Sequence, residues 1–258
     1  MELQVTVAPK NAANKNIKWK SSNAKIVSVD SKGKVTAVAP GTTTVTATAA
    51  DGSGINSVCT IKVTKLVTDV FMDIQKTDWW VDAVQFVYDH DIMAGSDIGF
   101  EPKAYLTREQ FVQVLYNHSG KPGAKGITNK FSDVKEAWYK DAVLWANKND
   151  ITSGYDDGRF GVGDKITREQ LTVMLYKYAK MKGFDLTATQ GLTDQYKDGK
   201  KVDTWAEQAM NWAVSQGIMS GKGTGTDKSK LLLDPLGNAT RAECATMIMK
   251  LLVKNGVN

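Results

Sequence analysis

The sequence predicts a two-part protein: a small all-β sandwich over residues 1–65, followed by an all-α region of three helical repeats. Two observations support this prediction. Up to about residue 65, apolar and polar residues alternate with the period of two that is typical of half-buried β-strands. From about residue 66 the apolar spacing becomes that of amphipathic helices, and one pattern occurs three times. At 258 residues the chain is also longer than most single domains, so more than one folding unit is expected.

The first 65 residues are predicted to form short antiparallel strands joined by tight turns. The alternating apolar residues are Leu3, Val5 and Val7, then Val45, Ala47 and Ala49, and finally Cys59, Ile61 and Val63. The segments 30–33 and 51–54 have the composition of β-turns. Because Cys59 lies on the apolar side of the last strand, we expect a small core residue rather than a reactive thiol. Residues 64–68 are expected to form a short linker.

Each repeat is predicted to begin with a helix that carries a tryptophan at its start and is followed by a glycine. The repeats span residues 66–125, 126–187 and 188–258; their tryptophans are Trp79, Trp138 and Trp205, and their glycines are Gly95, Gly154 and Gly221. Two interpretations of the tryptophans remain open, a core anchor or a platform on which a sugar ring stacks. The glycines most simply end the helices as C′ residues. Because they lack a side chain, they also let a ligand approach the backbone.

The second helix of each repeat is predicted to begin at a Thr-Arg pair. The pairs are Thr107-Arg108, Thr167-Arg168 and Thr240-Arg241, and a Gln or Glu stands three residues after each threonine. This spacing forms a capping box, in which the threonine hydroxyl and the Gln or Glu side chain satisfy each other's backbone amides. Apolar residues recur four, seven and eight positions beyond each threonine: Phe111, Val114 and Leu115; Leu171, Met174 and Leu175; Cys244, Met247 and Ile248. We therefore expect the three second helices to pack against one another.

The capping box leaves the arginines unexplained. The chain has 33 basic residues but only four arginines, and Arg108, Arg168 and Arg241 occupy the same position of the three repeats. A cation there faces the positive end of the helix dipole, which is unfavourable. Arginine differs from lysine in binding a planar anion, carboxylate or phosphate, through two parallel hydrogen bonds. The alternative is an ion pair with an acidic residue of a neighbouring repeat, such as Asp73, Asp133 or Asp198, and one site could use both.

Charge and composition exclude several functional classes. Residues 1–65 hold nine lysines and three acidic residues, a net charge of +6, whereas the remaining residues carry −1. This uneven distribution disfavours nucleic-acid binding by the larger part. No apolar run is long enough for a membrane-spanning helix. Neither a metal site nor a catalytic arrangement can be built around His90 and His118, so we expect no enzyme and no cofactor.

The repeat pattern resembles that of a known family. Its clearest copy, FSDVKEAWYKDAVLWANKNDITSGYDDGRF followed by KITREQ, contains the combination W…AV…G…F…TRE and resembles the S-layer homology (SLH) domain, with three tandem copies over residues 66–255. The stretch IKWKSSNAKIVSVDSKGKVTAVAPGTTTVTATAADGS resembles the bacterial Ig-like domain of group 2. Domains of this Ig-like family normally begin with one further strand, so we expect the β-domain to be truncated at its N-terminus.

The SLH resemblance implies a fold and a function. It implies a monomer with internal pseudo-threefold symmetry and grooves between neighbouring repeats. It also implies non-covalent anchoring of an exported protein to an anionic, peptidoglycan-linked cell-wall polysaccharide, often bearing pyruvate ketals. The implied location is the extracellular cell wall or S-layer, and the chain is expected to be a fragment lacking its signal peptide. The family's groove positions fall on the Thr-Arg pairs, on the glycines 95, 154 and 221, and on the tryptophans.

The third repeat departs from the SLH pattern, because its loop from Gly221 to Leu233 is longer. We therefore expect Arg241 to matter less than the other two arginines. A rival interpretation makes the chain a structural or adhesive stalk. In that case the lysine-rich β-domain binds a partner and the helical repeats only pack.

Overall fold

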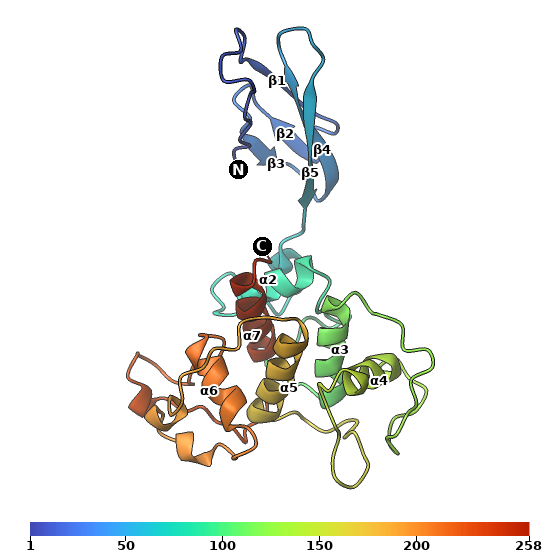
Figure 1. The fold of residues 1–258 in the computed structure, drawn as a ribbon, viewed down its shortest axis with the longest axis vertical. Coiled ribbons are helices and arrows are strands. Elements are labelled where there is room, and N and C mark those ends of the chain that lie inside the picture. The colour runs from blue at the N-terminus through green and yellow to red at the C-terminus, as the bar shows by residue number, and fades with distance from the viewer. Residues whose placement is uncertain (258) are drawn as a thin grey trace. The chain divides into compact units, whose positions relative to one another are not determined.

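The computed structural model describes residues 1–257 and divides the chain into two compact units, Met1–Leu66 and a second that begins at Val67 (Figure 1). The first contains only strands and the second only helices. The prediction of a small β-domain followed by a helical region is confirmed.

The first unit is built from two antiparallel sheets. One has the order β1-β4-β5, with strands Ile17–Ser21, Gly41–Ala49 and Asn56–Val63. The other pairs β2 (Val27–Val29) with β3 (Val35–Ala37). The core consists of Val27, Val35 and Val45, with Leu3, Trp19, Ile26, Val29, Ile61 and Val63 packed against it.

Two details of the β-domain prediction were wrong. Leu3, Val5 and Val7 form no strand; this segment is attached through the Leu3 N–H, which donates to Gly33 O at 3.0 Å. Cys59 is exposed, although it pairs with the buried Val45. The reason is that β5 is an edge strand, and its residues 56–60 are exposed on both faces.

Three repeats of two helices each form the second unit. The first helices are α2 (Val81–Asp89), α4 (Lys140–Lys148) and α6 (Glu207–Ser215); the second helices are α3 (Arg108–His118), α5 (Arg168–Met181) and α7 (Arg241–Lys254). Short helical turns add α1 (Val67–Val70), Thr193–Gln195, Gly199–Lys201 and Lys228–Lys230. Val67 is buried at the start of α1, so the expected linker over residues 64–68 is shorter than predicted.

All nine apolar positions predicted for the second helices are buried in one core. Cys244 is among them, and burial raises the pKa of its thiol to about 12, which fits packing rather than chemistry. The prediction that the three second helices pack mainly against one another was wrong. Instead, each packs most extensively with the first helix of the next repeat: α3 with α4, α5 with α6, and α7 with α2.

Pairing of α7 with α2 closes the three repeats into a ring. At its centre the Leu106 N–H donates to Ala239 O, the Ala239 N–H to Ile166 O, and the Ile166 N–H to Leu106 O, at 2.9, 2.9 and 3.0 Å. Three equivalent bonds that return to their starting residue define a pseudo-threefold axis. The expected pseudo-threefold symmetry is therefore present.

Candidate functional site

The three equivalent tryptophans lie on the surface, directly before the first helices. Trp79, Trp138 and Trp205 are 64%, 62% and 54% exposed, so the core-anchor interpretation is wrong. The next residue in each repeat takes the core position. Trp80 and Tyr139 pack against the core, and Ala206 is buried within it. An indole left this exposed offers an apolar face to a ligand.

The glycines do not end the first helices. The left-handed C′ residues are Asp91, Asp150 and Gly217, with φ of 55°, 56° and 70°. Gly154 lies four residues farther on, where a Cβ atom would stand 2.5 Å from the ring of Phe131. A Cβ atom added at Gly95 or Gly221 would likewise lie less than 3 Å from the ring of Phe71 or Tyr196. Glycine is required at these positions because an aromatic ring of the same repeat packs against the backbone.

The acidic residues considered as arginine partners have another role. Asp73 accepts the N–H groups of Phe100 and Glu101, and Asp198 accepts those of Leu233 and Asp234. Asp133 accepts three backbone N–H groups, from residues 160, 161 and 162. Burial alone would raise the pKa of Asp133, but these donors hold it below the usual value. Ion pairs of Asp73, Asp133 and Asp198 with the arginines were the alternative to anion binding, and they are absent from the described residues 1–257.

Each equivalent arginine reaches into the neighbouring repeat. Arg108 Nε donates to Phe160 O at 2.9 Å, Arg168 Nε to Leu233 O at 2.7 Å, and Arg241 Nε to Phe100 O at 2.7 Å. The accepting residues occupy one equivalent position of the repeat, seven residues before the threonine of each Thr-Arg pair. Because Arg241 contacts the first repeat, these bonds also run around the whole ring.

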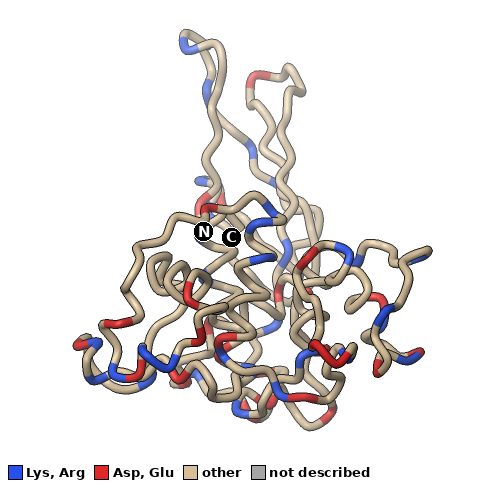
Figure 2. The backbone as a smooth tube through the Cα atoms, turned by 60° about the horizontal axis from the view of Figure 1, so that its bottom comes forward, with Lys and Arg blue, Asp and Glu red and all other residues tan. Residues whose placement is uncertain are grey.

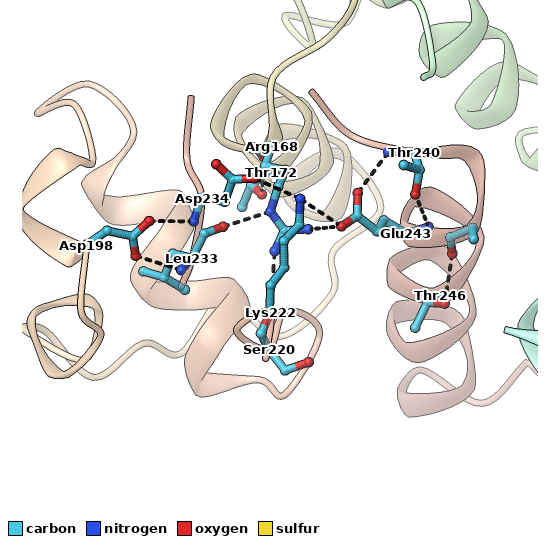
Figure 3. Close-up of polar contacts among 11 residues, drawn as sticks. Arg168, Thr172, Asp198, Ser220, Lys222, Leu233, Asp234, Thr240, Glu243 and Thr246 are labelled. Carbon is cyan, nitrogen blue, oxygen red and sulfur yellow. Dashed lines mark hydrogen bonds and ion pairs between the residues drawn. The ribbon is translucent and has the colours of Figure 1, made fainter. Parts of the chain in front are cut away.

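The terminal guanidinium nitrogens differ in their surroundings. Arg168 Nη1 forms an ion pair with Glu243 Oε1 at 2.9 Å (Figure 3). Arg108 Nη1 donates to the neutral Gln170 Oε1 at 3.3 Å, and Arg241 Nη2 to Ala94 O at 2.7 Å. Within the described chain, Arg108 and Arg241 have no acidic partner within 4.0 Å, and burial lowers the pKa of both guanidinium groups. Two of the three arginines are therefore partly desolvated cations without an ion pair.

The three threonines cap the second helices, as predicted. Thr167 and Thr240 accept the N–H groups of Gln170 and Glu243, and the return bonds close both capping boxes. The box of α3 has the same arrangement, but the Thr107 hydroxyl is buried without a hydrogen bond of normal geometry. The threonines thus orient the arginines that follow them.

Nine of the twelve predicted residues line three equivalent grooves, with volumes of about 380, 490 and 400 Å³. We name each groove by its glycine. The Gly95 groove contains Trp138 and Arg241, the Gly154 groove contains Trp205 and Arg108, and the Gly221 groove contains Trp79 and Arg168. Every groove takes its glycine and second helix from one repeat, its tryptophan from the next and its arginine from the preceding one. The threonines line none of these grooves.

The structure adds groove residues that the sequence did not single out. The fourth residue of each capping box, Gln110, Gln170 or Glu243, lines a groove, as do Lys222 and Lys250 of the third repeat. The sequence could have indicated Gln110, Gln170 and Glu243, because each follows the arginine of its repeat at the same distance. The expectation about the longer loop of the third repeat was wrong in one respect. That loop borders the groove of Arg168, whereas Arg241 lies in the Gly95 groove.

Within the described residues 1–257, no three His, Cys, Asp or Glu side chains are grouped as metal ligands. No helix in that range is both long and apolar enough to cross a membrane.

Comparison with known families agrees with this architecture. A family model described as S-layer homology domain matches residues 70–112, 130–172 and 195–245, which together are more than half of the chain. A model described as Bacterial Ig-like domain (group 2) matches residues 1–59.

Several curated proteins are similar to this chain. An amylopullulanase of Thermoanaerobacterium thermosulfurigenes is 31% identical over 188 residues, which are 72% of this chain and 10% of that protein. A surface-layer 125 kDa protein of Lysinibacillus sphaericus is 26% identical over 66% of this chain and 14% of its own length. A cellulosome-anchoring protein of Acetivibrio thermocellus is 26% identical over 62% of this chain and 34% of its own length. The chain thus spans about a third or less of these relatives, and it belongs to the S-layer homology domain family, with three copies of that domain after a bacterial Ig-like domain of group 2.

Proposed function

We propose that this chain anchors a surface protein non-covalently to the bacterial cell wall by binding an anionic wall polysaccharide in its three grooves. One observation carries the proposal: every groove combines an exposed tryptophan, a glycine and an arginine, each from a different repeat. The two relatives named for a surface layer and for anchoring support it, since their similarity covers the repeats. The chain acts as a non-catalytic module outside the cell, and its similarity to an amylopullulanase concerns a tenth of that enzyme.

The proposed contacts follow from the chemistry of the lining residues. A sugar ring stacks on the exposed indole, because the apolar face of the ring matches the aromatic surface. Glycine lets the ligand approach the backbone closely. The guanidinium groups of Arg108 and Arg241 keep N–H donors that their protein partners do not use, and a carboxylate accepts two of them in parallel.

A carboxylate on the polysaccharide is supported by the choice of arginine. In a chain where most basic residues are lysine, an arginine lines the groove at the equivalent position of all three repeats. A pyruvate ketal supplies one carboxylate on an otherwise neutral sugar ring, which fits a single guanidinium beside a tryptophan. We also propose that residues 66–125, 126–187 and 188–258 act as one monomeric binding unit.

The test is co-sedimentation of the whole chain with purified cell-wall sacculi. We expect binding to intact sacculi, a large loss after chemical extraction of the polysaccharide, and an intermediate loss after mild acid, which cleaves ketals first. Equal binding to extracted sacculi would contradict the proposal.

A stalk in which the β-domain carries the partner contact is the second candidate, and the charge of Met1–Leu66 favours it. Figure 2 shows basic positions spread over this unit, which holds nine lysines and three acidic residues up to residue 65. In that case extraction of the polysaccharide should reduce sedimentation of the whole chain. A chain that lacks residues 1–66 should sediment equally with intact and extracted sacculi.

A further inference from the structure

The Gly221 groove contains a network of charges (Figure 3). No ion pair joins two of the described residues that line either of the other two grooves. The Glu243 carboxylate lies at its centre. Its Oε1 accepts from Arg168 Nη1 at 2.9 Å and contacts Lys222 Nζ at 3.3 Å, while its Oε2 accepts the Thr240 N–H at 2.8 Å. Lys222 also donates to Asp234 Oδ2 at 2.8 Å. Two cations of this groove are thus already paired with two carboxylates of the protein.

The positions equivalent to Glu243 in the other two repeats are neutral. Gln170 replaces Glu243 in the Gly154 groove, and its Oε1 accepts from Arg108 Nη1 at 3.3 Å. Gln110 stands at this position in the Gly95 groove. Both glutamines still close their capping boxes, since their Oε1 atoms accept the N–H of the capping threonine. Capping therefore does not require the negative charge of Glu243.

Burial makes the Arg168–Glu243 pair hard to replace. The two side chains are 4% and 14% exposed, so both charges are largely removed from water. A ligand carboxylate entering beside Arg168 would meet a fixed like charge at short range, and displacing Glu243 would leave it without its partner. Lys250 also lines the groove, but it is a flexible point charge rather than a planar donor.

We propose that Glu243 is a specificity-determining residue: its carboxylate fills the position at Arg168 that a ligand carboxylate takes beside Arg108 and Arg241. The Gly221 groove therefore accepts neutral sugar units, and the Gly95 and Gly154 grooves accept the acidic ones. This inference rests on the proposed glycan-binding function and assigns different parts of one polymer to different grooves.

Titration calorimetry on the whole chain tests the inference, with a hexose 4,6-pyruvate ketal methyl glycoside as probe and its methyl ester as the uncharged counterpart. We expect two carboxylate sites in the parent and three in Glu243→Gln, with affinity at the new site rising about ten-fold. The reciprocal Gln170→Glu should leave one site, because it gives Arg108 the internal carboxylate that Arg168 has now. Binding of the uncharged ester should change much less than binding of the acid in both variants.

A matched control removes a carboxylate elsewhere. Glu136→Gln makes the same change in net charge at a position where Glu136 pairs with Lys140 on the surface, and it should leave two sites. Three equal sites in the parent, or a third site in Glu136→Gln as well, would overturn the role of Glu243 and leave the proposed function intact. Absence of probe binding in every protein, including the parent, would overturn both.

Discussion

The two units of this chain are held together in different ways. In Met1–Leu66 the sheets are built from hairpins and one further strand pair, so the contacts stay within about 65 residues. In the helical unit, the Arg241 side chain closes the ring on Phe100, 141 residues earlier in the chain. Each groove uses residues of all three repeats, so the proposed binding requires the whole ring and not one repeat. The following predictions test this contrast, from the largest expected effect to the smallest.

Ending the chain at residue 187 should abolish both cooperative unfolding and wall binding. The truncation removes α7, against which α2 packs, together with Arg241 of the Gly95 groove and Trp205 of the Gly154 groove. Circular dichroism should show a broad thermal transition in place of a sharp one. A sharp transition with parental binding would mean that the repeats are independent modules.

Substituting Gly154 by alanine should destabilise the helical unit by about 2–4 kcal/mol. A Cβ atom at Gly154 meets both the Phe131 ring and Arg159 O, and the backbone has a φ of 79°. Gly158 is a matched control, since its φ is 81° but nothing lies within 4 Å of the position that an added Cβ atom would take. Gly158→Ala should cost about 1 kcal/mol, from the backbone strain alone. Chemical denaturation measures both values, and equal costs would show that the aromatic ring does not require the glycine.

Replacing Trp138 by alanine should weaken binding of the pyruvate-ketal probe in the Gly95 groove by about ten-fold, or 1–2 kcal/mol. The melting temperature should change little, because Trp138 is mostly exposed. Trp145, which is 6% exposed, is the contrasting position: its alanine variant should lose stability by about 3–5 kcal/mol. A fall in melting temperature of Trp138→Ala as large as that of Trp145→Ala would make Trp138 a structural residue.

Deleting residues 1–66 should have the smallest effect. The remaining residues hold all three grooves, so wall binding should stay within about three-fold of the parent, less than 1 kcal/mol. Co-sedimentation with sacculi at matched ionic strength measures this directly. A larger loss would move the anchoring role to the lysine-rich β-domain.

Local features of the helical unit could be predicted from the sequence. The apolar spacing after Thr107, Thr167 and Thr240 identified the buried face of every second helix, because period and residue type both depend on local geometry. The capping boxes were predicted for the same reason. The prediction that Cys59 is buried was wrong. Alternation of apolar and polar residues indicates a face of a strand, but not whether another sheet covers that face.

Groove composition could not be predicted from the repeat alone. Three identical patterns show that Gly95 and Gly154 are equivalent, but not that Arg108 meets Gly154 and Arg241 meets Gly95. That pairing depends on the ring closure between distant residues. The partner of Arg168 was missed because Glu243 was fully explained as a capping residue, although its second oxygen was available for an ion pair.

Conservative substitution of the three arginines tests the central claim most directly, with probe affinity and melting temperature measured on each variant. Arg108→Lys and Arg241→Lys should each lose one carboxylate site, a ten- to hundred-fold drop that corresponds to about 1.5–3 kcal/mol. Their stability should fall by about 1 kcal/mol through the lost Nε bond. Arg168→Lys should keep both carboxylate sites and lose more stability, because the buried pair with Glu243 is weakened. Unchanged affinity in Arg108→Lys and Arg241→Lys would contradict the claim that these arginines bind the ligand.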